Sequence, residues 1–392
     1  MSLHGRRVLY VESYTSSPNT IVEPSSDSIG YGITASRAIR DKLQAMGHDI
    51  IRSSAYMPRR KARSGALARS EWILLTYSAV LNCLSTNTPD LVFCFHAFQA
   101  FPAEIRRTLL DLNLRIPLIG YTHGSHWDLT DLFRHDRYPG LEFADLGNLY
   151  AMDRILVTSQ YMRRTLHDNI GALNADLATL ISSKVRVVGL PIDIETIEQY
   201  RTEQRFPRVS IIYNHAPISA KDPMLFLDAI TEVLRTHDVD ILFTRKLPSH
   251  GPLRSRALTL NSRYPGRLHF GEDLPISDYY RWLWMADIQV STALHESLGI
   301  STLEAMYTYT CCLLPRVGSY PELCDGDEQI LYSRSADELI ERLRYLIDNE
   351  KTRAELGERL RRLAFRFAPD RVARSIDAVI REVLGVPRPG QL

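Results

Sequence analysis

Two carboxylates, Glu296 and Glu304, stand eight residues apart around Gly299 in the stretch HESLGISTLEAM, residues 295–306. An apolar strand pattern precedes the glycine and an apolar helical pattern follows it, which predicts a helix N-terminus near Gly299. Ser301 with Glu304 three residues later fits a capping box, in which both side chains satisfy amides of the first helical turn. Glu296 precedes that helix, so capping does not explain it.

The backbone amides of Gly299, Ile300 and Ser301 would form an anion site at this helix N-terminus, and such a site suits phosphate. The ionised carboxylates on either side can accept hydrogen bonds from sugar hydroxyl groups. A ligand that carries phosphates and hydroxyls together therefore fits the arrangement. A nucleotide sugar has both.

Short apolar runs separated by helical patterns must position these residues. The runs are apolar throughout rather than alternating, which predicts parallel strands covered by helices on both faces. Two consecutive series of strand–helix units predict an α/β protein with two doubly wound, Rossmann-like domains that face a cleft. The predicted strands are residues 8–13, 49–54, 90–95, 117–123, 154–159 and 185–191 in the first series, and 209–215, 239–244, 267–270, 286–291 and 310–315 in the second.

The two series of strands divide within residues 190–208. We predict an N-terminal domain over residues 1–190, a C-terminal domain over 191–365 and a final helical segment over 366–392. Apolar residues with helical spacing follow Pro369, a residue suited to a helix start. They are Val372, Ile376, Val379, Ile380 and Leu384.

Composition excludes several classes of protein. The 392 residues are 45% hydrophobic and include 47 Lys and Arg against 46 Asp and Glu, so no overall field favours DNA or an anionic membrane. No segment approaches the roughly 18 apolar residues of a membrane span, and the start of the chain lacks a signal-peptide core. Five cysteines without CxxC spacing indicate free thiols in a cytoplasmic protein, with no disulfide and no zinc site.

The motif resembles the E-x7-E signature of the retaining group 1 glycosyltransferases, which have the two-domain GT-B fold. The segment VGSYPELCDG, residues 317–326, resembles the GG-x-PE loop of the same family. The resemblance implies that Glu296 contacts the donor sugar, that Glu304 holds the nucleotide ribose and that the amides between them bind the pyrophosphate. It also implies an N-terminal acceptor domain, a C-terminal donor domain and a final helix that crosses back to the first domain.

The family usually places an arginine, and a lysine five residues later, after the first strand of the donor domain. This sequence keeps the lysine, Lys221, but has Ala216 where the arginine would stand. Arg245 follows the next strand, whose carboxyl end should face the cleft, and is our candidate for the missing charge. Lys246, or a solvated surface role for Arg245, is the alternative.

Four further residues complete the predicted site. His123 ends a predicted strand of the first domain and resembles the family's active-site histidine, which contacts the donor sugar; His126 is the alternative. Asn214 stands at the carboxyl end of the first donor-domain strand and is assigned to the donor site. Gly30 and Gly32 form a GxG pattern in a region that borders donor phosphate and acceptor in the family, although tight turns alone would also account for it.

The resemblance thus implies a retaining glycosyltransferase that moves a hexose from a UDP- or GDP-sugar to an acceptor hydroxyl. Glu296, Lys221 and His123 would act in catalysis. We expect no metal and no other cofactor, because nothing resembles an Asp-x-Asp metal pair. The alternatives are a GT-B epimerase or phosphorylase and a non-catalytic nucleotide-sugar-binding protein, the last favoured by Ala216.

The acceptor class stays open among small molecules, lipids, glycans and modified nucleosides. A basic run at residues 59–69 is followed by the apolar stretch 72–81. The run is either a solvated face or a weak peripheral contact with lipid headgroups or an anionic acceptor. Stable DNA binding is not expected from the balanced charge.

Overall fold

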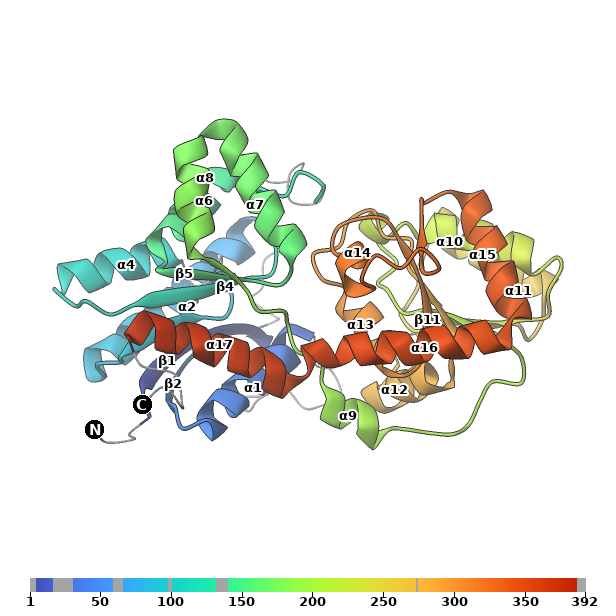
Figure 1. Cartoon of the computed structure of the whole chain (residues 1–392), viewed down its shortest axis with the longest axis horizontal. Helices are drawn as coiled ribbons and strands as arrows, with labels where there is room; N and C mark the ends of the chain where they lie inside the picture. Colours follow the sequence, from blue (N-terminus) through green and yellow to red (C-terminus); the bar gives the residue numbers. More distant parts are fainter. Residues whose placement is uncertain are drawn as a thin grey trace. The chain divides into compact units, whose positions relative to one another are not determined.

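The structure is a computed structural model that describes residues 5–16, 31–58, 66–97, 101–131, 140–272 and 274–385. The chain forms two compact units, drawn in Figure 1. The first comprises Met1–Pro191 together with Pro369–Leu392, and the second comprises Ile192–Ala368. The predicted domain borders follow residues 190 and 365, whereas the corresponding borders of the structure follow Pro191 and Ala368.

The described residues of each unit form one six-stranded sheet, and every strand pair in both sheets is parallel. The central strands are buried at every position, as expected when helices cover both faces. The predicted α/β class with two Rossmann-like domains is confirmed.

The first unit has the strand order β2-β1-β3-β4-β5-β6. From β1 to β2 the chain moves across the sheet in one direction, and from β2 onward it moves across the sheet in the opposite direction. Right-handed crossovers therefore place α1 on one face of the sheet and α2, α4 and α6 on the other. The elements are β1 (Arg7–Ser16), α1 (Tyr31–Ala45), β2 (Asp49–Pro58), α2 (Ala66–Thr86), β3 (Leu91–Cys94), α4 (Pro102–Asp111), β4 (Leu118–Thr122), α6 (Leu141–Ala151), β5 (Arg154–Val157), α7 (Gln160–Leu173), α8 (Ala175–Lys184) and β6 (Val185–Val187).

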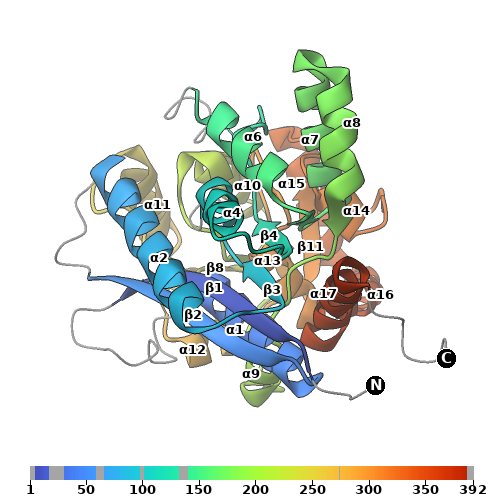
Figure 2. The same ribbon diagram turned by 90° about the vertical axis from the view of Figure 1, so that its left-hand side faces the viewer.

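The C-terminal helix α17 (Pro369–Leu384) returns to the first unit and lies beside α1, as Figures 1 and 2 show. It buries the apolar stripe recognised in the sequence, including Val372, Ile376 and Ile380. The Nε2 atom of the buried His48 lies 2.7 Å from Asp377 of this helix. The predicted final helix that crosses back to the first domain is therefore confirmed.

The second unit has the strand order β12-β11-β10-β7-β8-β9. Its last strand, β12, contains only two residues, too few to show a sequence pattern, and was not predicted. The elements are α9 (Ile194–Gln199), β7 (Ser210–Tyr213), η2 (Ser219–Lys221), α10 (Pro223–Val233), β8 (Asp240–Phe243), α11 (Pro252–Arg263), β9 (Leu268–Phe270), α12 (Ile276–Met285), β10 (Ile288–Val290), α13 (Ile300–Tyr307), β11 (Cys311–Pro315), α14 (Tyr320–Leu323), β12 (Leu331–Tyr332), α15 (Ala336–Asp348), α16 (Glu350–Ala364) and η3 (Phe365–Phe367).

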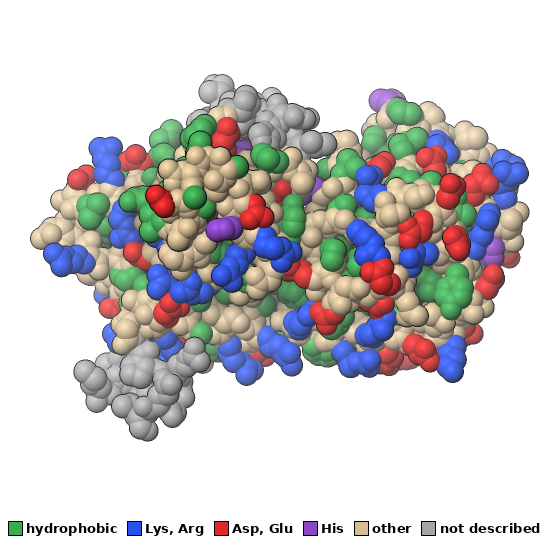
Figure 3. All heavy atoms as spheres, turned by 45° about the horizontal axis from the view of Figure 1, so that its top comes forward, with side chains coloured by type: hydrophobic (Ala, Val, Ile, Leu, Met, Phe, Trp, Pro, Cys, Tyr) green, Lys and Arg blue, Asp and Glu red, His purple; other side chains and the backbone are tan. Residues whose placement is uncertain are grey.

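Positive and negative side chains intermingle over the face drawn in Figure 3, in line with the balanced charge of the sequence. Within the described residues, no helix is both long enough and apolar enough to cross a membrane. The five cysteines are free thiols, and all but Cys83 are buried. Gly30 and residues 59–65 of the basic run lie outside the described residues.

Candidate active site

The candidate site forms where the strand order of the second sheet reverses. The neighbouring strands β7 and β10 lead in opposite directions, β7 through α10 to β8 and β10 through α13 to β11. Right-handed crossovers then place α10 and α13 on opposite faces, and the carboxyl ends of two such strands are where open α/β sheets bind ligands. The two loops there contact each other, because the Leu294 amide donates to the Ala220 carbonyl oxygen over 2.9 Å.

Local hydrogen bonds hold the backbone of Lys221 in the loop after β7. The carbonyl oxygen of Lys221 accepts from the Tyr213 hydroxyl over 2.9 Å and from the Thr292 hydroxyl over 2.8 Å. Asp222, in the left-handed conformation with a φ of 41°, caps α10 and pairs with Arg334 over 2.6 Å. The lysine side chain therefore projects from a fixed point.

The ammonium of Lys221 forms an ion pair with Glu296 across the two loops. Its Nζ atom lies 2.5 Å from Glu296 Oε2 and 3.3 Å from the His295 carbonyl oxygen. Burial acts to raise the pKa of Glu296, but the charge and the hydrogen bond of Lys221 outweigh it and the pKa is lowered. Glu296 is thus held ionised, and these two contacts with described residues use two of the three N–H bonds of Lys221.

The loop that resembles the family's GG-x-PE segment clamps the backbone of Glu296. The Ser319 amide donates to the Glu296 carbonyl oxygen over 3.0 Å, and the Tyr320 hydroxyl lies 3.4 Å from Glu296 Oε2. Gly318 adopts a φ of 55°, and a Cβ atom added to it would lie 2.1 Å from the Glu296 carbonyl oxygen. Only glycine allows this approach.

The close approach at Gly318 predicts that Gly318→Ala costs roughly 2–4 kcal/mol, from backbone strain and a clash with Glu296. Gly326→Ala in the same loop is the matched control, since Gly326 has a φ of 72° but open space around the added Cβ. It should cost only about 1–2 kcal/mol of strain. Thermal unfolding of both variants measures the difference, and equal losses of Tm would show that the clamp is unimportant.

The capping box predicted for Ser301 and Glu304 is wrong. Gly299, with a φ of 90°, is the N-cap residue of α13, and among the described residues no side chain caps this helix. Ser301 therefore lies inside the first turn, and its hydroxyl lies 2.9 Å from His215 Nδ1. The first-turn amides have no partner within the helix and, in the described part of the chain, no side-chain cap, an arrangement that suits an anion.

Two tyrosines of α12 hold Glu304 instead. Its carboxylate accepts from the Tyr279 hydroxyl over 2.6 Å and from the Tyr280 hydroxyl over 3.1 Å. Burial raises the pKa of Glu304, although both hydrogen bonds and the charge of Arg245 oppose the shift. The exposed Arg245 stands over the Tyr279 ring, with its guanidinium carbon 5.4 Å from the ring centroid, and so belongs to the same site.

Asn214 is buried behind the site, where its amide nitrogen donates to the Ser301 carbonyl oxygen over 2.7 Å and to the Tyr279 hydroxyl over 3.3 Å. In this position Asn214 supports α13 and is not exposed for contact with a ligand. Sequence reasoning missed five residues of this site, which lie on separate strands, helices and loops: His215, Tyr279, Tyr280, Gln289 and Tyr320. A tyrosine pair in an apolar helix was the only signal of them.

Family comparisons bear on both units. Residues 250–363 match the family model described as "Glycosyl transferases group 1", and residues 40–196 match the one described as "Glycosyltransferase Family 4". The two models match different parts of the chain and both describe glycosyltransferases, so the chain belongs to the GT-B glycosyltransferases.

Solved structures share the fold of this glycosyltransferase at low sequence identity. The catalytic domain of Starch Synthase IV from Arabidopsis thaliana, bound to ADP and acarbose, is 11% identical with a TM-score of 0.74, over 97% of this chain and 100% of that one. Sucrose-phosphate synthase from Thermosynechococcus elongatus is 13% identical with a TM-score of 0.72, over 97% and 99%. A putative UDP-N-acetylglucosamine 2-epimerase from Listeria monocytogenes is 13% identical with a TM-score of 0.63, over 99% of both chains.

The structure gathers most of the predicted site residues of the glycosyltransferase in its second unit. His123 and Gly32 belong to the first unit, where Gly32 lies in the first turn of α1. His123 Nε2 lies 3.0 Å from the Phe95 carbonyl oxygen, and its ring stacks on Tyr121. His126, the alternative, is buried with its Nδ1 atom 2.7 Å from Asp145. The ligand roles of His123, Gly30 and Gly32 stay predictions.

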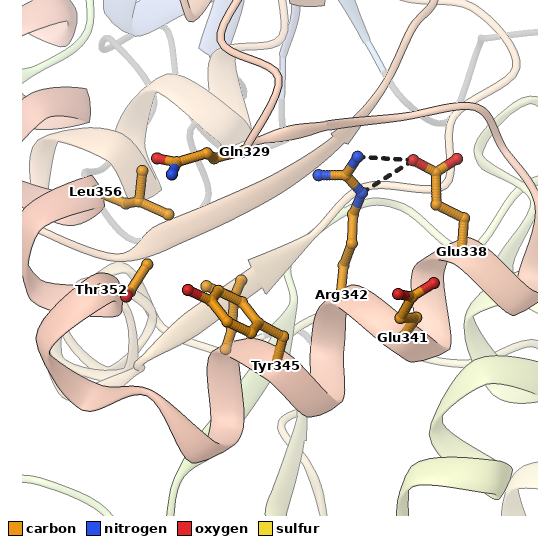
Figure 4. Close-up of a pocket in the computed structure, with 8 residues that line it drawn as sticks. Gln329, Glu338, Glu341, Arg342, Tyr345, Thr352 and Leu356 are labelled. Carbon is orange, nitrogen blue, oxygen red and sulfur yellow. Dashed lines mark hydrogen bonds and ion pairs between the residues drawn. The ribbon is translucent and has the colours of Figure 1, made fainter.

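A separate hollow of about 550 Å³ lies over α15 and α16 of the glycosyltransferase, and Figure 4 shows the residues that line it. Glu338 and Arg342 form hydrogen bonds with each other on this wall, so each neutralises the other. None of its lining residues is among the residues gathered around Lys221. The hollow is therefore distinct from the candidate active site.

Proposed function

We propose that this glycosyltransferase is a retaining enzyme that moves a hexose from a UDP- or GDP-sugar to an acceptor hydroxyl. The observation that carries the proposal is the ion pair of Lys221 and Glu296, 2.5 Å apart beside the uncapped N-terminus of α13. A site for a nucleotide sugar needs positive groups for the pyrophosphate and an anion near the sugar. This loop pair offers both.

The pyrophosphate would bind to the first-turn amides of α13 and to the remaining N–H bond of Lys221. Both groups stabilise the negative charge that develops as the sugar–phosphate bond breaks, and such preorganised donors contribute most where charge develops. Glu296, kept ionised by Lys221, would stabilise the positive charge that develops on the sugar.

The nucleotide half of the donor would lie toward Glu304. Ribose hydroxyls can donate to its carboxylate, which the tyrosines of α12 hold in place. Arg245, whose charge acts on both Glu304 and His215, would supply part of the charge lost with Ala216.

Retention follows if attack and departure occur on the same face of the sugar. The bond from C1 to the phosphate oxygen breaks, and the bond from C1 to the acceptor oxygen forms. The leaving phosphate oxygen takes the proton of the acceptor hydroxyl, so the step needs no separate protein base. In this proposal the second unit is the donor domain and the first unit is the acceptor domain.

A thermal-shift screen with UDP-, GDP-, ADP- and TDP-sugars tests the donor class. A ligand at 100 times its Kd stabilises the protein by about 2.7 kcal/mol, which should raise Tm by several degrees for the matching base. The matched donor should then release free nucleoside diphosphate on incubation with the enzyme and candidate acceptors. No shift with any of the four donors would contradict the proposal.

Two specific observations favour functions other than glycosyl transfer. The epimerase similarity favours a GT-B epimerase, which would convert the sugar nucleotide without any acceptor, whereas a phosphorylase would depend on free phosphate. Ala216 favours a binding protein that takes up the donor without ever releasing free nucleoside diphosphate. Product analysis with and without acceptor and phosphate separates the three from glycosyl transfer.

We further propose that transfer needs no divalent metal, because the α13 amides and Lys221 can neutralise the pyrophosphate. Activity should therefore change less than twofold when EDTA is added to excess. The measurement is the rate of nucleoside diphosphate release before and after chelation. Complete loss of turnover in EDTA that manganese restores would contradict this expectation.

A further inference from the structure

A chain of buried polar side chains lies behind the first turn of α13. Asn214 and His215 follow β7, Gln289 is on β10, and the chain ends at the hydroxyl of Ser301. Asn214, His215 and Gln289 are 1%, 3% and 0% exposed. Burying so many polar atoms costs free energy unless each donor faces an acceptor. The direction of each hydrogen bond in the chain can therefore be inferred from its neighbours.

The direction of this chain is set at the Ser301 carbonyl oxygen, which can only accept. Asn214 therefore turns its amide nitrogen toward it, at 2.7 Å. The Asn214 Oδ1 atom consequently faces Gln289 and accepts from Gln289 Nε2 over 3.3 Å. The opposite orientation of Gln289 would set two acceptor oxygens against each other.

The same Gln289 nitrogen lies 3.0 Å from His215 Nε2. An amide NH2 group only donates, so His215 Nε2 must carry the lone pair and the ring proton must lie on Nδ1. Burial, together with the charge of Lys221, lowers the pKa of His215 to about 3, which keeps the ring neutral with a single proton.

The Nδ1–H group of His215 then donates to Ser301 Oγ over 2.9 Å. Because that ring nitrogen has no lone pair to offer, the Ser301 hydroxyl cannot donate back to it. Its own proton must point elsewhere, and Ser301 is half-buried at the start of α13, where the amides of the first turn also lie.

We propose that Asn214, Gln289 and His215 are positioning residues that fix the Ser301 hydroxyl as a hydrogen-bond donor to the pyrophosphate. This inference rests on the proposed function, and it adds a side-chain donor to the amides and the lysine. Because His215 Nδ1–H occupies one lone pair of Ser301 Oγ and cannot accept, the hydroxyl proton is kept from the ring and is left to donate to a ligand. The site would thereby favour a ligand with acceptor oxygens, such as a diphosphate.

Two measurements test the inference separately. Long-range proton–nitrogen correlation spectra of the ¹⁵N-histidine-labelled protein, with His215 identified by comparison with His215→Asn, report the tautomer without any ligand. We expect the Nδ1–H form from pH 7 down to pH 5. An Nε2–H form or a charged ring in this range would overturn the inference whatever the protein binds.

The second measurement is calorimetric binding of UDP, GDP, ADP and TDP and of the matching nucleosides. For the diphosphate that binds best, Ser301→Ala should raise Kd about tenfold or more, because a hydrogen bond to a charged group is lost. The nucleoside should bind equally to both proteins. Ser301→Thr, which keeps the hydroxyl, should stay within about twofold of the wild type.

Gln289→Met should raise the Kd of the diphosphate as well, because His215 is then free to change tautomer. In the double variant Ser301→Ala/Gln289→Met, Kd should be no higher than in Ser301→Ala alone, since both changes remove the same donor. Additive losses, or unchanged diphosphate binding by Ser301→Ala, would overturn the inference. If the wild type binds none of the four diphosphates, the proposed function and the ligand role of Ser301 both fail, while the tautomer result still stands.

Discussion

Replacing Lys221 by alanine is expected to lower kcat/KM for the matched sugar nucleotide by about 10²–10³-fold, as removal of a single donor at a developing negative charge does in other enzymes. The variant loses the cation opposite the leaving pyrophosphate. It also leaves the half-buried Glu296 without its 2.5 Å partner, which costs stability. Steady-state kinetics with matched melting temperatures measures both effects.

Two controls separate charge from packing. Lys221→Arg keeps the positive charge and should retain more activity than Lys221→Ala. Lys351→Ala removes a lysine whose side chain is 90% exposed on α16 and should leave kinetics and Tm unchanged. A Lys221→Ala variant with normal kcat/KM would contradict the role given to this residue.

The ion pair also predicts how stability depends on pH. The pKa of Glu296 is lowered in the folded protein, so its contribution to stability is fully present above its ordinary value of 4.5 and is lost as pH falls below it. Because Lys221→Ala removes the main cause of the lowered pKa, the wild type should lose more Tm than the variant between pH 5 and pH 3. Parallel curves would contradict the assignment.

The second large expected effect is that substitutions of the two glutamates of the motif change different kinetic constants. Glu296→Gln should lower kcat by about 10²-fold with little change of KM, because its charge acts on the cationic transition state. Glu304→Gln should raise the KM of the donor about tenfold or more, because charge-assisted bonds to ribose hydroxyls are worth roughly 1.5–3 kcal/mol. If kcat and the KM of the donor changed alike in both variants, the assignment of the two glutamates to opposite ends of the donor would be contradicted.

Stability provides an independent measurement on Glu304. Its pKa is raised in the folded protein, so ionisation lowers stability progressively as pH rises above the ordinary value of 4.5. Glu304→Gln removes this cost. Its Tm relative to the wild type should therefore increase from pH 4 to pH 7, and a deficit that widens toward pH 7 would show that the carboxylate is instead stabilising.

The strands, and the placement of Lys221 and Glu296 at one edge of a sheet, were predictable from local sequence. Continuous apolar runs identify strands that are buried on both faces, and apart from the two-residue β12 both sheets are built from such runs. Lys221 and Glu296 each follow a predicted strand, and parallel strands bring their carboxyl ends to one edge. The spacing of residues therefore carried enough information to bring these two side chains together.

The error at α13 has a physical cause. Ser301 and Glu304 have the spacing of a capping box, but that spacing does not reveal which residue is the N-cap. Gly299 takes this place in a left-handed conformation, which moves Ser301 into the first turn. The hydroxyl and the carboxylate are then used by residues from other elements.

Those other residues could not be found from local sequence. Gln289 stands in an apolar run that predicts a buried strand, and the run does not indicate a polar partner. His215 follows β7 and Tyr279 lies on α12, and only the folded sheet brings them to α13. Long-range packing, which no local pattern encodes, determined their positions.

The most direct test of glycosyl transfer at this site is time-resolved proton NMR of the enzyme with an α-linked sugar nucleotide, the one that gives the largest thermal shift, with water as acceptor. The account predicts that free nucleoside diphosphate and the α-hexose appear together, before mutarotation forms the β-anomer, and that Lys221→Ala abolishes both signals. Initial formation of the β-hexose would contradict retention. A sugar nucleotide that is epimerised while its diphosphate stays intact would contradict glycosyl transfer itself.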